Sequence, residues 1–86
     1  PEFNYTNEVR FSKGKIRVHL TIKEGIVKAC QINGDFLGLI PIEPLEEVIE
    51  GTAYRYDDMA SRLEGVDLAL YLRGISRGEL LQCIFR

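Results

Sequence analysis

The segment KIRVHLTIKEGIV, residues 15–27, decides the fold. Its first nine residues alternate between polar and apolar side chains, and the apolar ones are Ile16, Val18, Leu20 and Ile22. A period of two is typical of a β-strand that buries one face and leaves the other in water. The pattern therefore predicts a strand over about residues 15–23.

The turn after this strand contains Glu24-Gly25, and its length determines which face of the next strand is buried. A loop of two residues pairs Ile22 with Val27. That pairing sends Ala29 and Gln31 toward the core, which is a poor apolar face.

A loop of three residues instead pairs Ile22 with Ile26 and sends Cys30 and Ile32 to the core. It also places Gly25 at the left-handed position that this kind of hairpin favours, which glycine adopts without steric penalty. We therefore predict the three-residue loop, because it gives the more apolar face.

The three-residue loop turns Lys28 inward, which requires an open strand end where the ammonium can reach water. The third strand is predicted over 26–33. An upstream strand over about 8–12 has Val9 and Phe11 as its apolar positions. Together these segments predict a three-stranded antiparallel meander.

Helical patterns follow the strands. Pro44 suits a first helical turn, acidic residues surround it, and an i, i+3, i+4 apolar stripe ends at Gly51. Further helical segments are predicted over 56–63 and 66–72. Ser76 and Glu79 have the spacing of a capping box that opens a last helix. Three strands followed by three to four short helices on one face of the sheet define an α+β domain.

The composition indicates one soluble domain over residues 1–86. The net charge is −2 and no run of 18 apolar residues occurs, so we expect neither a nucleic-acid-binding surface nor a membrane span, although the first third is locally basic. Cys30 and Cys83 both have apolar neighbours. We therefore expect buried, reduced thiols and a cytoplasmic location.

No pattern in the sequence predicts a catalytic, cofactor-binding or metal-binding residue. His19 is the only histidine and lies on the polar face of its strand without a spaced partner. Zinc-ligand spacing and a phosphate-binding glycine loop are both lacking. The acid pairs Glu46-Glu47 and Asp57-Asp58 are explained by helix dipole and solubility. The chain is therefore predicted to be an accessory, regulatory or interaction domain.

An ordered set of short motifs resembles the small C-terminal accessory domain of lipoate-protein ligases. The resemblance covers nearly the whole chain. Its motifs are PEFN at residues 1–4, Arg10-Phe11, the hairpin KIRVHLTIKEGIV, GDF at 34–36, PLEEVIEG at 44–51, Tyr54, and YLRGISRGELL at 71–81. The chain departs from the family pattern at Leu72, where an aromatic is frequent, and at Gly78, where a larger or charged residue is frequent.

The resemblance implies a function in two steps. Such ligases use ATP to activate lipoate to lipoyl-adenylate, and then transfer the lipoyl group to a lysine of an acceptor domain. The acceptors belong to 2-oxoacid dehydrogenase or glycine cleavage proteins. A large catalytic domain holds ATP, Mg and lipoate, and in some organisms the small domain is a separate polypeptide. The isolated domain is expected to be inactive.

The resemblance also raises the question of what Gly34-Asp35-Phe36 does. In one interpretation the glycine turns the chain, Asp35 accepts backbone hydrogen bonds and Phe36 packs over the sheet edge. In the other, Asp35, Phe36, Arg10 and Phe11 contact the large domain. Because the chain begins at Pro1 rather than Met, we expect a C-terminal piece of a longer ligase. Residues 2–3 alternatively represent a cloning remnant.

Three other classes of function remain open. A scaffold of the sulfur-transfer or iron-sulfur-assembly type could share an α+β fold, and it requires an exposed, reactive cysteine at position 30 or 83. A general protein-interaction domain requires only a docking surface. A nucleic-acid module would bind with a strong dependence on salt concentration.

Overall fold

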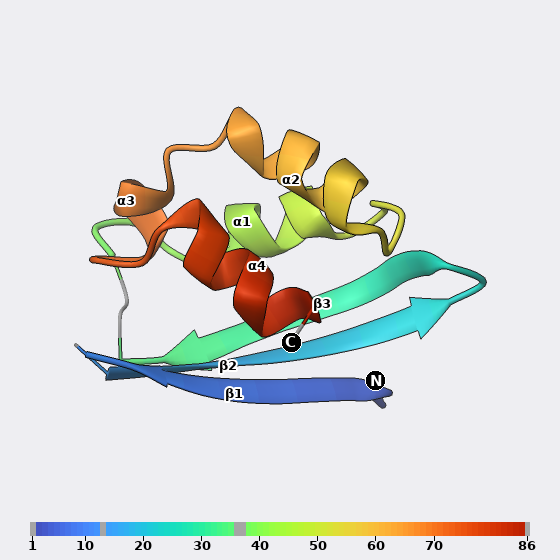
Figure 1. The fold of residues 1–86 in the computed structure, drawn as a ribbon, viewed down its shortest axis with the longest axis horizontal. Helices are drawn as coiled ribbons and strands as arrows, with labels where there is room; N and C mark the ends of the chain where they lie inside the picture. Colours follow the sequence, from blue (N-terminus) through green and yellow to red (C-terminus); the bar gives the residue numbers. More distant parts are fainter. Residues whose placement is uncertain (1, 13, 36–37, 86) are drawn as a thin grey trace.

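A computed structural model describes residues 2–12, 14–35 and 38–85. Three antiparallel strands lie in the order β1-β2-β3. Their bounds are Tyr5–Phe11 for β1, Gly14–Lys23 for β2 and Ile26–Gly34 for β3. The helices are α1 at Glu43–Ile49, α2 at Tyr56–Glu64, α3 at Leu68–Tyr71 and α4 at Arg77–Phe85. Figure 1 shows the helices on one face of the sheet, so the predicted α+β meander is confirmed.

Strand β1 begins at Tyr5, three residues before the predicted start at residue 8, and it ends at Phe11 rather than 12. Half-buried side chains alternate with exposed ones along its whole length. The early part was missed because Asn7 occupies an inward position, where its amide Nδ2 donates to the Cys83 carbonyl at 3.1 Å. A polar residue with a buried partner hides the apolar alternation.

The prediction of a three-residue turn between β2 and β3 is wrong. Ile22 pairs with Val27 and Lys23 pairs with Ile26, which leaves only Glu24 and Gly25 in the turn. Both have positive φ, 54° and 76° respectively. This is the backbone of a two-residue hairpin turn whose twist matches that of the strands.

A β-bulge directly after this turn changes which side chains of β3 point toward the core. The register shifts between Thr21 and Ile22, so that Thr21 lies opposite Ala29 and Lys28 has no partner residue on β2. Lys28 is exposed, whereas Val27, Cys30 and Ile32 are all buried. The extra residue thus combines the short turn with the apolar face that the longer turn was expected to supply.

The core lies between the inner face of the sheet and the helices. The sheet contributes fully buried side chains at Ile16, Val18, Leu20 and Val27. The helices contribute Leu45, Ile49, Met59, Leu63, Leu80, Cys83 and Ile84, each no more than 1% exposed. Figure 1 shows that the opposite face of the sheet carries none of the described helices.

Helix α1 covers the outer edge of β3. The backbone amide of Ile32 donates to Glu46 Oε2 at 2.8 Å, and the amide of Cys30 donates to Glu50 Oε2 at 3.2 Å. The amide of Val27 donates to the Thr52 carbonyl at 3.0 Å. Helix dipole and solubility therefore do not fully explain Glu46, because its carboxylate also accepts a hydrogen bond from the edge of the sheet.

The helix starts and ends largely follow the predicted signals. The amide of Glu79 donates to Ser76 Oγ at 3.1 Å, and the amide of Ser76 donates to Glu79 Oε1 at 2.9 Å. The predicted capping box is thus confirmed. The segment predicted over 66–72 forms only the single turn of α3, which leaves Leu72 extended and buried.

Candidate functional site

The corner after β3 is held by reciprocal hydrogen bonds with β2. The Lys15 amide donates to Asp35 Oδ2 at 3.2 Å, and the Asp35 amide donates to the Lys15 carbonyl at 3.1 Å. A Cβ at Gly34 would lie 2.5 Å from that same carbonyl oxygen, so only glycine allows this approach. The expected acceptance of a backbone hydrogen bond by Asp35 is confirmed.

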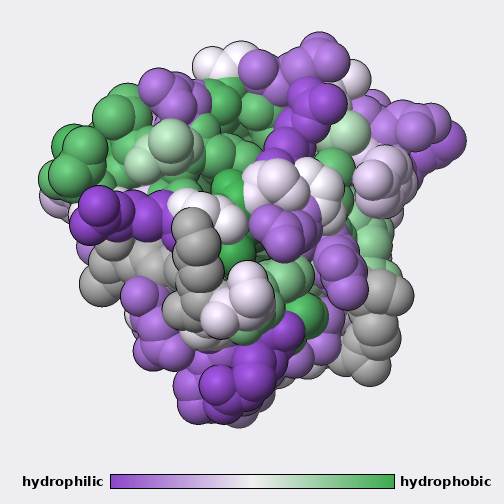
Figure 2. Space-filling model, turned by 60° about the vertical axis from the view of Figure 1, so that its left-hand side comes forward, coloured by the Kyte–Doolittle hydropathy of each residue, from purple (hydrophilic) through white to green (hydrophobic). Residues whose placement is uncertain are grey.

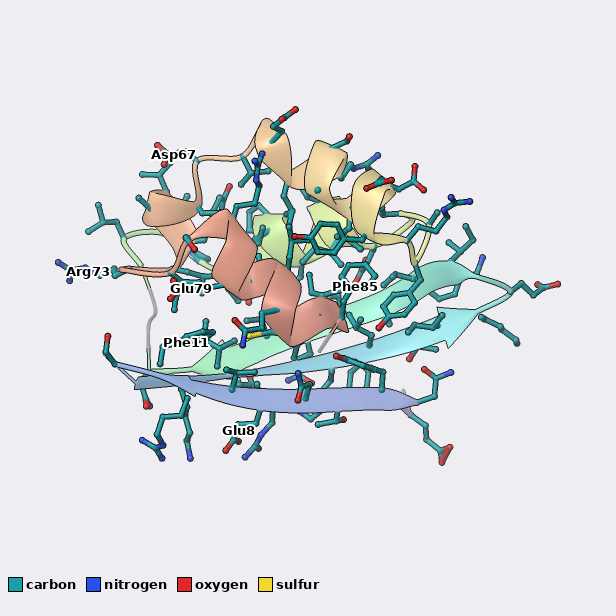
Figure 3. All side chains as sticks on the ribbon, viewed as in Figure 1. Glu8, Phe11, Asp67, Arg73, Glu79 and Phe85 are labelled. Atoms are coloured by element: carbon teal, nitrogen blue, oxygen red, sulfur yellow. The ribbon has the colours of Figure 1, made fainter. Side chains whose placement is uncertain are left out.

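Arg10 and Phe11 point to opposite faces of β1. Arg10 is exposed on the open face and lies opposite Lys15 in the sheet, which in turn bonds to Asp35. Phe11 is half-buried and packs against the core, and Figure 3 shows it on the helix side of the sheet. The structure therefore brings Arg10 and Asp35 into one cross-strand row. Phe36 lies outside the described residues.

A hollow of about 220 Å³ adjoins this row on the open face of the sheet. Its lining comes from all three strands and the corner, namely Glu8, Lys15, Arg17, Asn33, Gly34 and Asp35. Sequence reasoning did not single out Glu8, Arg17 or Asn33. The sequence does indicate that all three side chains point to the polar face of their strands. That they lie side by side follows only from the strand register.

Charges in the hollow are engaged with one another. Glu8 Oε1 accepts from Arg17 Nη2 at 2.6 Å and from Arg17 Nε at 2.9 Å, and Glu8 Oε2 lies 4.0 Å from Lys15 Nζ. The hydrogen bond from Arg17 lowers the pKa of Glu8 below its ordinary value. The lining thus combines two carboxylates with two cations, and it contains no thiol, hydroxyl or imidazole.

The two thiols are unsuited to surface chemistry. Cys30 and Cys83 are free and buried. Burial raises the pKa of Cys83 to about 11 and raises the pKa of Cys30 further. The prediction of buried thiols is confirmed. The hypothesis of a sulfur-transfer scaffold requires an exposed, reactive cysteine, and the burial of both thiols contradicts that requirement.

His19 lies on the open face, but it is half-buried rather than fully exposed. Its Nδ1 is 2.9 Å from Thr6 Oγ1, and its ring stacks on Phe3 with centroids 5.2 Å apart. Among the described residues, no group of three His, Cys, Asp or Glu side chains is arranged to hold a metal ion. Within the same residues, no helix has the length and apolar character to cross a membrane.

Comparison with known proteins gives one consistent family. The family model described as "Bacterial lipoate protein ligase C-terminus" matches residues 1–84. A lipoate-protein ligase from Streptococcus pyogenes serotype M5 is 40% identical over 85 residues, which are 99% of this chain and 25% of that protein. Lipoate-protein ligase LplJ of Bacillus subtilis is 34% identical over 85 residues, 99% of this chain and 26% of LplJ. The chain thus spans about a quarter of the length of these relatives.

Among solved structures, a chain from an archaeal lipoylation system of Thermoplasma acidophilum has the same fold. That work describes a bi-partite lipoate protein ligase and its E2 lipoyl domain. The TM-score is 0.73 at 21% sequence identity, over 93% of this chain and 92% of the other. At 21% identity, this similarity supports a shared fold for the two chains.

Proposed function

The chain belongs to the family of bacterial lipoate-protein ligase C-terminal domains, and on that premise we propose that it acts as the accessory domain of such a ligase. In this role it assists ATP-dependent activation of lipoate to lipoyl-adenylate, and then transfer of the lipoyl group to a lysine of an acceptor domain. The observation that carries the proposal is the family match over residues 1–84.

The proposed division of labour places the chemistry outside this chain. About three quarters of each curated relative lies beyond the part matched here. ATP, Mg and lipoate would be bound there, and the charges of Glu8, Lys15 and Arg17 in the hollow on the open face are paired with one another. The chain would therefore contribute binding surfaces and positioning rather than reacting groups.

The proposed contacts with the catalytic part include Arg10, Phe11, Asp35 and Phe36. Arg10 and Asp35 support this role because both are exposed and lie in one row across the sheet. Phe11 offers only part of its ring, since the remainder packs against the core. A domain that works in two steps needs contacts that differ between the two arrangements of the partners.

The proposed partners are the catalytic part of the ligase, either covalently joined or a separate chain, and the lipoyl acceptor domain. The archaeal structure with the same fold comes from a ligase described as bi-partite. This supports the possibility that a domain of this fold acts as a chain separate from the catalytic part. The acceptors would be domains of 2-oxoacid dehydrogenase or glycine cleavage proteins.

The test mixes this chain with a ligase catalytic part truncated before the matched region. Adenylate formation is measured by pyrophosphate release without acceptor, and transfer is measured by mass spectrometry of the acceptor after adding preformed lipoyl-adenylate. We expect the chain alone to be inactive and to increase at least one of the two rates when added. If neither rate responds to saturating chain, or if the chain alone forms adenylate, the proposal fails.

A further inference from the structure

Three large apolar side chains reach the surface at one end of the molecule. Leu39 is 75% exposed, Ile40 39% and Leu70 37%. They come from two segments about 30 residues apart in sequence, and we call this group the Leu39 patch. Figure 2 brings this end of the molecule forward and shows apolar atoms reaching the surface there.

The backbone beneath the Leu39 patch is fixed by hydrogen bonds to α3. The amides of Leu39 and Ile40 both donate to the Leu70 carbonyl, at 2.9 and 3.2 Å, and the Gly38 amide donates to the Tyr71 carbonyl at 2.8 Å. A Cβ at Gly38 would overlap the Leu70 carbonyl. The backbones of the two segments are therefore held together by hydrogen bonds, and the exposed side chains project from this bonded backbone.

An ordered apolar surface is well suited to binding. Rigid presentation reduces the conformational entropy that association must otherwise overcome. Asp67 and Arg73 are exposed and flank α3, and Figure 3 shows both side chains at this end of the molecule. An apolar centre bordered by charged side chains is the usual anatomy of a protein interface.

The patch lies at the same end of the molecule as the contacts proposed above. It begins four residues after Asp35, and Figure 1 shows the end of β1, the end of β3 and α3 at the same end of the molecule. Arg10 and Phe11 lie at that end of β1. The apolar patch in the helix layer and the polar corner of the sheet therefore lie at the same end of the molecule.

We propose that the Leu39 patch is the docking surface for the catalytic part of the ligase. This rests on the proposed function and adds the apolar anchor to it. The catalytic part is the occupant best supported, because the two bacterial ligases compared above each have about three quarters of their length outside this domain, in the same polypeptide. Burial of a side chain as exposed as Leu39 removes apolar surface from water, which favours binding.

The test measures binding of this chain to the truncated catalytic part by isothermal titration calorimetry. Leu39→Asp is expected to raise the Kd about 10-fold to 100-fold, because the apolar burial is lost and a charge enters the contact. Leu39→Met preserves the apolar surface and is expected to keep the Kd within about threefold. Thermal unfolding of each variant alone verifies that the fold is intact.

Tyr56→Asp is the matched control, because Tyr56 is also a large exposed hydrophobic, at 54%, but lies on α2 outside the patch. Its Kd should match the wild type. If Leu39→Asp and Tyr56→Asp behave alike while the wild type binds and stimulates, the docking surface is wrong and the proposed function stands. A wild type that neither binds nor stimulates overturns both. Self-association of the chain that Leu39→Asp abolishes, seen by sedimentation, would assign the patch to a second copy instead.

Discussion

Glu46 and Glu50 satisfy backbone amides that would otherwise face outward from the edge strand β3. Four residues along a helix span about 6 Å, and two residues along a strand span about 6.6 Å, so carboxylates at i and i+4 match amides at j and j+2. The partners are Ile32 and Cys30. Covering the edge in this way also blocks its pairing with a strand of another chain.

We predict that Glu46→Ala lowers the free energy of unfolding by about 1 to 2 kcal/mol, because the amide of Ile32 loses a charged acceptor. Glu47→Ala is the control, since Glu47 is an exposed neighbour on the same helix, and its effect should stay within about 0.5 kcal/mol. Urea unfolding measures both. Equal values for the two variants would mean that water replaces the carboxylate at no cost.

At the scale of elements, the β2–β3 hairpin depends on one unusual residue. Glu24 adopts φ 54°, a left-handed conformation that is costly for a side chain of this type. Gly25 follows at φ 76° without that cost. The turn and the bulge at Lys28 together set the register, so the backbone strain at one residue supports the burial of the whole inner face of β3.

Glu24→Asn is expected to stabilise the domain by about 0.5 to 1 kcal/mol, because asparagine followed by glycine is the preferred pair for this two-residue turn. Glu24→Gln changes the charge without supplying that preference and should leave stability nearly unchanged. Both variants are compared by urea denaturation. A stabilisation by glutamine equal to that by asparagine would point to the charge rather than the backbone.

Two glycines in regular elements are expected to respond in opposite ways to alanine. Gly34→Ala should destabilise by about 2 to 3 kcal/mol, since its Cβ would meet the Lys15 carbonyl at the end of the sheet. Gly78→Ala should stabilise by about 0.5 kcal/mol, because the nearest atom to its Cβ in α4 is Ser76 Oγ at 3.9 Å and alanine favours the helix. Thermal unfolding distinguishes the two signs directly.

At the scale of the whole molecule, distant segments hold the end of α4. The Cys83 carbonyl accepts from Tyr5 Oη at 2.7 Å and from Asn7 Nδ2, and the Ile84 carbonyl accepts from Tyr54 Oη at 2.7 Å. Carbonyls in the last turn of a helix have no partners within the helix. Strand β1 and the segment before α2 therefore cap α4, which joins the two ends of the sequence through one helix terminus.

Tyr54→Phe is predicted to cost about 1 kcal/mol, because it removes the hydrogen bond to the Ile84 carbonyl while preserving the ring that stacks on Phe85. Tyr5→Phe should cost less, since Asn7 continues to donate to the Cys83 carbonyl. Equilibrium unfolding in urea gives both values. A larger loss for Tyr5→Phe than for Tyr54→Phe would refute the idea that Asn7 shares the acceptor.

Local patterns in the sequence were sufficient for most of the elements. The alternation of residues 15–23 predicted β2, Ser76 and Glu79 predicted the start of α4, and the apolar neighbours of both cysteines predicted buried thiols. Each of these signals depends on residues close together in the chain. The order of the short motifs was likewise enough to place the chain in its family.

Only the tertiary structure decided how these elements meet. The pairing of α1 carboxylates with the β3 edge, the hollow around Glu8 and the hydrogen bonds beneath Leu39 all join residues far apart in sequence. A side chain's neighbours across such distances depend on strand register and helix placement, which local periodicity does not encode. The sequence by itself therefore determined the elements and the family, and packing determined the surface available to a partner.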